Sequence, residues 1–235
     1  MSDNFMDNRK NTLLSLVVNN YIQTAEPVGS RFLLSSGKVD CGEATIRNEL
    51  RALENEGYLT HPHTSAGRIP TEKGYRHYVE NLDNKKAKIT KKENNVLGMS
   101  VKSDDEYKSS RKNLAKSLVE LSNETIILAF SPDSVYYTGL ANLFSKPEFN
   151  ELQLVADVSA VFDHCENCLE GFFDQTKDKV DIYIGNEHPF GDMLSVVASR
   201  FSNDQVEDGL IALMGPMRMD YQKNLALVNK VKEII

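Results

Sequence analysis

The stretch from Ala44 to Arg51 combines residue types and a spacing that suit contact with DNA bases. Ile46, Leu50 and Leu53 are separated by four and then three residues, which predicts a helix with one apolar stripe. Turning this stripe towards a core directs a row of small and polar side chains outward: Ala44, Arg47, Asn48, Arg51 and Asn55, with Thr45 at its edge. Arginine pairs with guanine O6 and N7, and asparagine pairs with adenine N6 and N7. The outward row is therefore a candidate for base contacts.

The residues after this helix predict a hairpin and a further helix. Pro62, the run 65–67 (Ser-Ala-Gly) and Pro70 are turn residues placed between short apolar and polar positions. We expect a small hairpin with Arg68 at its tip, followed by a helix that Thr71 caps. The order helix, hairpin, helix is typical of a winged recognition unit.

The residues before the outward row predict the first helices of a helix-turn-helix. Residues 9–24 have helical periodicity and end before Pro27, and Ser30 is a candidate N-cap for a short helix over 31–36. In this arrangement the first helices cross the DNA backbone and the next helix enters the major groove. Exposed arginines are also common on plain solvated helix faces, so spacing alone leaves both interpretations open.

Charge is distributed unevenly along the 235 residues, whose net charge is −7. Residues 1–84 hold 9 Lys or Arg and 11 Asp or Glu, residues 85–116 hold 10 and 4, and residues 117–235 hold 8 and 19. The basic run adjoins the candidate DNA-binding domain, but that domain is not itself basic, so we expect modest non-specific DNA affinity. Without a long apolar run or an apolar leader, we expect no membrane span and no signal peptide. The odd count of three cysteines indicates reduced thiols, so we expect a cytoplasmic location.

The C-terminal half predicts a mixed domain. Residues 124–131 and 135–142 suggest two strands around a turn, and a long helix opens near Lys146 and extends to about Phe173. Three further strands are expected within 180–215, followed by a last helix from Pro216.

Cys165 and Cys168 form the one CxxC pair, beside His164. The pair could bind a metal or act in redox chemistry, but a structural zinc site usually needs four ligands, and a buried pair of thiols on one helix face has the same spacing. Hydrolase, P-loop and metalloprotease signatures are missing from the sequence. We therefore expect no enzyme, no cofactor and no metal.

Several stretches resemble the heat-inducible transcription repressor family HrcA. They are YIQTAEPVGSRFL, ATIRNEL, LENEGYL, PHTSAGRIPT and GYRHYV in the N-terminal part, and YYTGLANLFSKPEF, IGNEHP and GLIALMGPMRMDYQKNLALV in the C-terminal half. The segment from Pro62 to Thr71 resembles the family pattern without a gap, at exposed turn positions that packing alone does not dictate.

The chain departs from the family at two places. The family usually has a serine in the cap position before ATIRN, where this chain has Cys41, Gly42 and Glu43. Glu43 suits the helix dipole but would repel nearby phosphates. Around 129–136 the family has a much longer segment, including a dimerising domain, so the chain resembles a shortened member and its dimerisation mode cannot be carried over.

The resemblance implies an α+β chain: a winged helix-turn-helix over 1–82, a Lys-rich linker with the start of a connecting helix over 83–112, and a reduced GAF-like α/β regulatory domain over 113–235. It implies a repressor of chaperone genes that binds an inverted-repeat operator as a homodimer, is relieved by heat and is helped by the chaperonin. The implied DNA-contact residues are Thr45, Arg47 and Asn48 for bases, Arg51, His63, Thr64, Ser65 and Arg68 for phosphates or the minor groove, and Ser30, Ala44 and Gly67 beside them.

Two other functions stay open at this point. The acidic C-terminal half could make the chain a protein-binding or ligand-sensing adaptor that binds DNA weakly. Cys165 and Cys168 could make it a thiol- or metal-sensing regulator.

Overall fold

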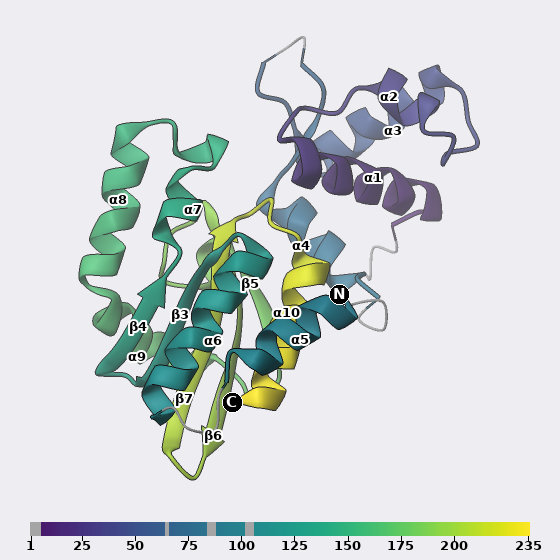
Figure 1. The fold of residues 1–235 in the computed structure, drawn as a ribbon. Helices are drawn as coiled ribbons and strands as arrows, with labels where there is room; N and C mark the ends of the chain where they lie inside the picture. The colour runs from purple at the N-terminus through teal and green to yellow at the C-terminus, as the bar shows by residue number, and fades with distance from the viewer. Residues whose placement is uncertain (1–5, 64–65, 84–87, 102–105) are drawn as a thin grey trace. The chain divides into compact units, whose positions relative to one another are not determined.

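The computed structural model describes residues 6–63, 66–83, 88–101 and 106–235. The chain divides into two compact units, residues 1–82 and 83–235. Each unit has its own helices and its own sheet (Figure 1). Among the described residues, no helix is long and apolar enough to span a membrane.

The described residues of the first unit form four helices and a short hairpin. In chain order its described elements are α1 (Asn8–Thr24), α2 (Ser30–Ser35), α3 (Glu43–Asn55), β1 (Leu59–Thr60), β2 (Ile69–Pro70) and α4 (Glu72–Glu80). The two strands are antiparallel, with Leu59 opposite Pro70. The helix, hairpin, helix order that the sequence predicts is therefore present.

The ends of these helices confirm one of the two predicted caps and correct the other. Gly57 follows α3 with a φ of +79°, a left-handed conformation that glycine adopts without strain. Thr71 accepts a hydrogen bond from the amide of Gly74 and so caps α4. The predicted cap of α2 is wrong: Gly29 occupies the cap position and Ser30 is the first helical residue. The hydroxyl of Ser30 instead donates to a carboxylate of α3.

The apolar stripe of α3 lies in the core of the first unit. Ile46, Leu50 and Leu53 are all buried, as predicted, and α3 packs against α1 and α2. The buried residues of α1 are Leu13, Leu14, Val17 and Val18. This packing fixes the rotation of α3 about its axis, because turning the helix would expose apolar side chains to water.

The second unit begins with helices where the sequence suggested a linker. Its described elements are α5 (Lys91–Met99), α6 (Tyr107–Ser122), β3 (Thr125–Ser131), β4 (Ser134–Thr138), α7 (Leu140–Phe144), η2 (Pro147–Phe149), α8 (Leu152–Asp163), α9 (Cys165–Gln175), β5 (Asp181–Ile184), η3 (Gly185–Glu187), β6 (Leu194–Asn203), β7 (Val206–Pro216) and α10 (Tyr221–Ile234). Thr90 and Glu93 form a capping box at the start of α5, and Leu97 is fully buried. The part of the predicted linker around 91–99 is therefore a packed helix.

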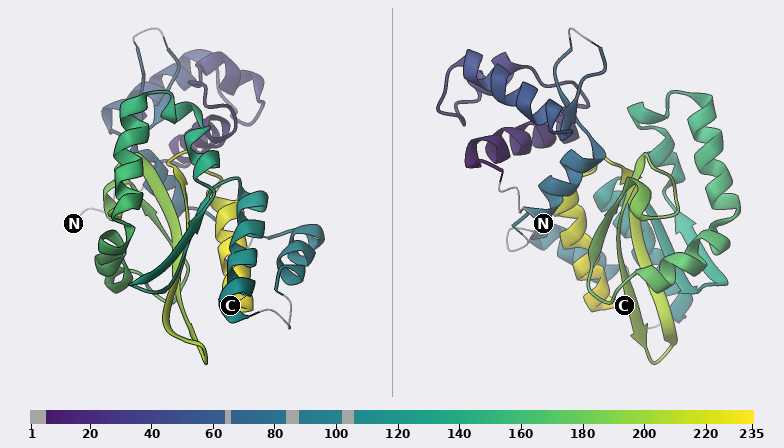
Figure 2. Two further views of the ribbon diagram at one scale, coloured as in Figure 1. Left: turned by 60° about the vertical axis from the view of Figure 1, so that its left-hand side comes forward. Right: turned by 180° about the vertical axis from the view of Figure 1, so that it is seen from behind.

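One antiparallel sheet organises this unit. Its described strands have the order β4-β3-β7-β6-β5, and each neighbouring pair is antiparallel. Helices α6 and α10 cover one face, while α7, α8 and α9 lie on the other (Figure 2). Because both faces are covered, the central strands β3 and β7 are long apolar runs in place of an alternating pattern.

The predicted long helix from Lys146 to Phe173 is wrong. The segment forms the short turn η2 and two separate helices, α8 and α9, which meet at His164. His164 has a non-helical conformation, with a φ of −120° and a ψ of 27°. The break lets apolar side chains of both helices, including Phe162 and Phe172, enter one core with the sheet.

A buried carboxylate lies at the start of β3. Glu124 is 4% exposed and its Oε1 lies 2.8 Å from Nζ of Lys146, while Oε2 is buried without a hydrogen-bond partner. Arg218 and Glu148 form a second ion pair whose charges also act on Glu124. Burial raises the pKa of Glu124 to about 7, against the opposing charge of Lys146.

This carboxylate makes stability depend on pH in a definite direction. Because the folded pKa lies above the unfolded value, the native state holds a proton between about pH 4.5 and 7 that the unfolded state releases. Stability therefore falls as pH rises through this window and levels off above it. For Glu124→Gln we expect this contribution, ~3 kcal/mol at most, to disappear. The measurement is the difference between wild-type and variant unfolding free energies across the window.

Taking this difference is necessary because burial lowers the pKa of His188 to about 4, which has the opposite effect on stability over part of the same range. Glu233→Gln, at an exposed ion pair with Lys230, is the control and should follow the wild-type profile. Parallel profiles for wild type and Glu124→Gln would contradict the assignment.

Candidate nucleic-acid interface

The outward face of α3 is exposed as the apolar stripe predicts. Ala44, Arg47, Asn48 and Arg51 are exposed, and Thr45 is half-buried at the edge of the row. The row has the length of about two helical turns, and its side chains include both base-reading types that the sequence suggested. The exposed side chains of this row are therefore outside the packed core of the first unit.

Arg47 is held by a small polar network at the start of α3. Its Nη2 donates to Oε1 of Glu43 at 2.6 Å, and its Nε donates to the hydroxyl oxygen of Ser30 at 3.3 Å. The hydroxyl of Ser30 donates in turn to the same Glu43 oxygen at 3.1 Å, and Nε of Arg31 lies 3.9 Å from it. The hydrogen bond from Ser30, followed by those of Arg47, holds the pKa of Glu43 below its ordinary value.

The hairpin is anchored at its base by a backbone bridge to the turn between α1 and α2. The amide of Val28 donates to the carbonyl of Arg68, and the amide of Arg68 donates to the carbonyl of Val28, both at 2.9 Å. A Cβ added to Gly67 would lie 2.6 Å from the carbonyl carbon of Val28. Glycine is therefore required here so that the two backbones can approach.

The prediction that Arg68 lies at the hairpin tip is wrong. Arg68 lies at the base, where its side chain is 22% exposed. Its Nη2 is 2.8 Å from Oε2 of Glu54, and His61 contacts the other oxygen of the same carboxylate. The backbone bridge to Val28 draws Arg68 inward, so Glu54 of α3 and the hairpin share one ion-pair cluster.

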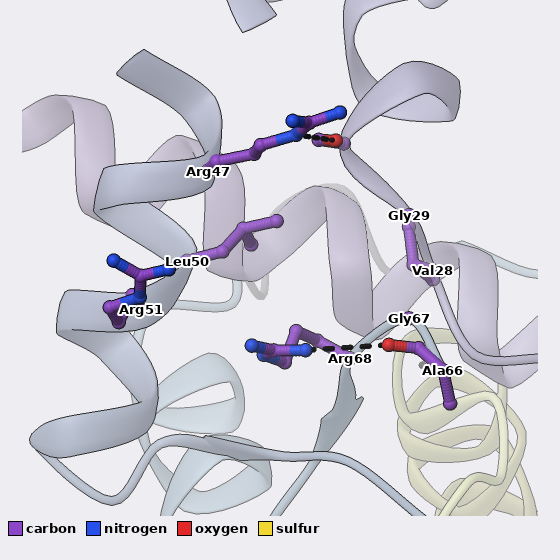
Figure 3. A pocket seen from close by; sticks show the side chains of 9 residues that line it. Val28, Gly29, Arg47, Leu50, Arg51, Ala66, Gly67 and Arg68 are labelled. Carbon is purple, nitrogen blue, oxygen red and sulfur yellow. Dashed lines mark hydrogen bonds between the residues drawn. The ribbon is translucent and has the colours of Figure 1, made fainter. Parts of the chain in front are cut away.

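A hollow of about 300 Å³ separates α3 from the hairpin base (Figure 3). Its lining residues are Val28, Gly29, Ser30, Arg47, Leu50, Arg51, Ala66, Gly67 and Arg68. Three guanidinium groups thus border one concave surface whose floor includes backbone and the apolar Leu50. Such a surface suits an anionic, ribbon-shaped ligand such as a nucleic-acid backbone.

Of the other predicted contact residues, Ser30 and Gly67 line this hollow, and His63 does not. Ser30 begins α2, Gly67 lies beneath the hairpin, and His63 is exposed in the hairpin loop. Thr64 and Ser65 lie outside the described residues. Sequence reasoning missed Glu54, although its spacing of seven from His61 and its place near the end of α3 put it beside the hairpin.

The competing thiol site receives little support from its surroundings. Burial raises the pKa of Cys168, which lowers its fraction of reactive thiolate at neutral pH. Among the described residues, no group of three or more His, Cys, Asp or Glu side chains could hold a metal ion.

Comparison with known proteins decides the family. The family model described as the HrcA protein C-terminal domain matches residues 79–225, which is more than half of the chain. The chain belongs to the HrcA family. This HrcA-family chain is also similar, over 97% of its length, to proteins named "Heat-inducible transcription repressor HrcA" from Thermodesulfovibrio yellowstonii (24% identical, 97% of that protein) and Acetivibrio thermocellus (28%, 95%).

The alignments show that this member of the HrcA family is shortened. The alignment with the T. yellowstonii relative spans 336 positions, whereas the chain has 235 residues, so about a hundred positions have no counterpart here. Another relative with the same name, from Thermoanaerobacter pseudethanolicus, is 52% identical over 77 residues, 33% of this chain and 22% of that protein. These relatives are named as transcription repressors and not as enzymes.

A crystal structure reported as that of a hypothetical protein has the same fold as this HrcA-family chain. It superposes with a TM-score of 0.77 over 97% of this chain and 98% of that one, at 16% sequence identity. The similarity supports the mixed arrangement of helices and antiparallel sheet described above.

The close approach at Gly67 leads to a stability prediction. Gly67→Ala places a Cβ against the backbone of both Val28 and Pro27, which cannot give way as a side chain could. We expect the first unit to lose about 1–3 kcal/mol of stability, measured by thermal or denaturant unfolding.

Gly98→Ala is the matched control, because a Cβ at Gly98 meets nothing within 4 Å and alanine favours the helix α5. It should leave the stability unchanged or slightly raised. Equal stability of Gly67→Ala and wild type would mean that the hairpin base is not packed as described.

Proposed function

We propose that the chain is a sequence-specific transcriptional repressor that binds an inverted-repeat operator of chaperone genes and is released by heat. The names of the relatives, which align over nearly the whole chain, support the repressor role. The observation that carries DNA binding is the exposed row on α3, because its arginine and asparagine side chains project from a helix whose other face is buried.

In this proposal residues 1–82 are a winged helix-turn-helix. Helix α3 enters the major groove, where Thr45, Arg47 and Asn48 contact bases. Ser30, Arg51 and the hairpin-base residues Gly67 and Arg68 line the hollow next to α3. In this proposal Arg51, Ser30 and the hairpin contact phosphates or the flanking minor groove. The remaining proposed DNA-contact residues are Ala44, His63, Thr64, Ser65, Gly67 and Arg68.

The inverted repeat requires two copies of the chain. A two-fold operator presents the same half-site twice, so a homodimer places one α3 on each half, and the second contact benefits from a high effective concentration. In this proposal the second unit, residues 83–235, is the regulatory part, and residues 113–235 within it form a reduced GAF-like domain. Heat acts on this regulatory part, and the chaperonin is the proposed protein partner in the bacterial cytoplasm.

A protein-binding adaptor with weak DNA affinity is the second candidate function. Two observations favour it: residues 1–84 carry more acidic than basic side chains, and two arginines of the interface are paired with carboxylates of α3. Non-specific DNA affinity depends on the number of cations near phosphates, so this pairing weakens it.

Substitution of Arg47 separates the two candidates. With Arg47→Ala we expect operator binding to weaken by about 1–3 kcal/mol together with a loss of base preference, because a bidentate pair to guanine is removed. Arg51→Ala should weaken binding to every sequence more evenly and reduce the salt dependence. The measurement is a gel-shift titration on a duplex that the wild-type chain selects from a random-sequence pool, and on a scrambled duplex.

Arg200→Ala is the control, since this arginine forms a similar ion pair with Asp208 in the second unit. It should bind both duplexes like wild type. Equal losses on both duplexes for Arg47→Ala would contradict the base-reading role. If the wild-type chain selects no sequence at all, the adaptor function is favoured.

A further inference from the structure

Glu43 stands out because it is an acidic side chain next to Arg47 and Ser30, two residues of the surface proposed to meet DNA. It is the first residue of α3, and its Oε1 accepts from Ser30 and Arg47 while Arg31 lies nearby. Carboxylates repel phosphates, so this residue opposes the general attraction between the protein and any DNA. A role that only disfavours binding does not account for the two hydrogen bonds that this oxygen accepts, from Ser30 and from Arg47.

The geometry explains how the carboxylate can favour one class of complex. Glu43 and Ser30 hold Nη2 and Nε of Arg47, and Nη1 makes none of the described hydrogen bonds within the chain. An arginine on a flexible stem loses rotamer freedom when it binds a base, and a side chain that is already held loses less. The network therefore orients the rest of the guanidinium for a base edge before DNA arrives.

We propose that Glu43, together with Ser30, is a positioning residue that sets the sequence specificity of Arg47. The inference rests on the proposed DNA-binding function. The carboxylate weakens every complex equally through repulsion, whereas its orienting effect strengthens only complexes in which Arg47 meets the correct base. The net result is a larger ratio of specific to non-specific affinity.

Two substitutions of Glu43 separate charge from orientation. Glu43→Gln removes the charge but keeps an oxygen that can accept from Ser30 and Arg47, whereas Glu43→Ala removes both. Binding is measured for the full chain on poly(dI-dC) and on the duplex selected by wild type, over a series of salt concentrations. Both variants should bind poly(dI-dC) about 3–10-fold more tightly, because one repulsive charge is gone.

The two variants should differ in discrimination. For Glu43→Ala we expect the ratio of affinities for the two DNAs to fall about tenfold, and for Glu43→Gln clearly less, because part of a bidentate base contact depends on the orientation. Ser30→Ala should also reduce the ratio without tightening the binding of poly(dI-dC). In the double variant Glu43→Ala, Arg47→Ala the ratio should equal that of Arg47→Ala alone, since Glu43 acts through Arg47.

Glu49→Ala is the matched control on the same helix. Glu49 pairs with Arg9 of α1 at 3.7 Å, and Arg9 is outside the proposed contact set. It should leave the affinity ratio at the wild-type value. Far-ultraviolet circular dichroism and thermal unfolding of each variant show whether the helices remain folded.

The outcomes separate a failure of the positioning role of Glu43 from a failure of the proposed DNA-binding function. If wild type binds both DNAs equally, the proposed function fails and the inference fails with it. If wild type discriminates and Glu43→Ala discriminates equally well, or if the effects of Glu43→Ala and Arg47→Ala simply add, only the positioning role is overturned.

Discussion

The burial of one apolar stripe on α3 is the constraint on which the interface depends. The helix buries Ile46, Leu50 and Leu53 against neighbouring helices. Exposing any one of these side chains to water would cost about 1.5–3 kcal/mol of folding free energy. Their spacing leaves no other rotation of the helix that keeps all three buried. The packing of the apolar stripe therefore directs the opposite face, with Arg47 and Asn48, towards solvent.

Electrostatics then shape what this face can do. Glu43 and Glu54 lie one near each end of α3, and each pairs with an arginine of the proposed interface, Arg47 and Arg68. The pairs at Glu43 and Glu54 reduce the positive field that would attract any DNA. A repressor must find its operator among a large excess of other sequences, and a weak general attraction reduces the share of protein held at wrong sites.

The second unit is built on a different principle. Its sheet is covered by helices on both faces, so its central strands consist almost entirely of buried apolar residues. Glu124 is an exception, a buried carboxylate beside Lys146 at the start of β3. In a buried ion pair, the free energy lost by removing both ions from water offsets much of the attraction between them. The pH dependence of this unit therefore includes two buried groups of opposite effect: the raised pKa of Glu124 lowers stability as pH rises, and the lowered pKa of His188 raises it.

Local patterns in the sequence predicted the helices and the hairpin of the first unit. They also predicted which residues face outward on α3. Helical periodicity, turn residues and caps such as Gly57 and Thr71 act over a few neighbours, so they can be recognised without a fold. A turn signal between two apolar runs likewise predicted the antiparallel pair of β3 and β4, but the second strand was expected to reach residue 142, whereas it ends at Thr138 and helix α7 begins at Leu140. The resemblance to the HrcA family likewise rests on contiguous stretches of residues, which can be recognised without a structure.

Only the tertiary structure decided which charged groups meet. Arg68 was expected at the hairpin tip, but the backbone bridge to Val28, forty positions earlier, holds it at the base beside Glu54. Ser30 was expected to cap α2, yet its hydroxyl donates to Glu43 and accepts from Arg47, both on α3. The order of the five described strands and the burial of Glu124 were likewise beyond local pattern. The physical reason is shared: these contacts join residues distant in sequence, and their energies depend on a geometry that only the packed chain defines.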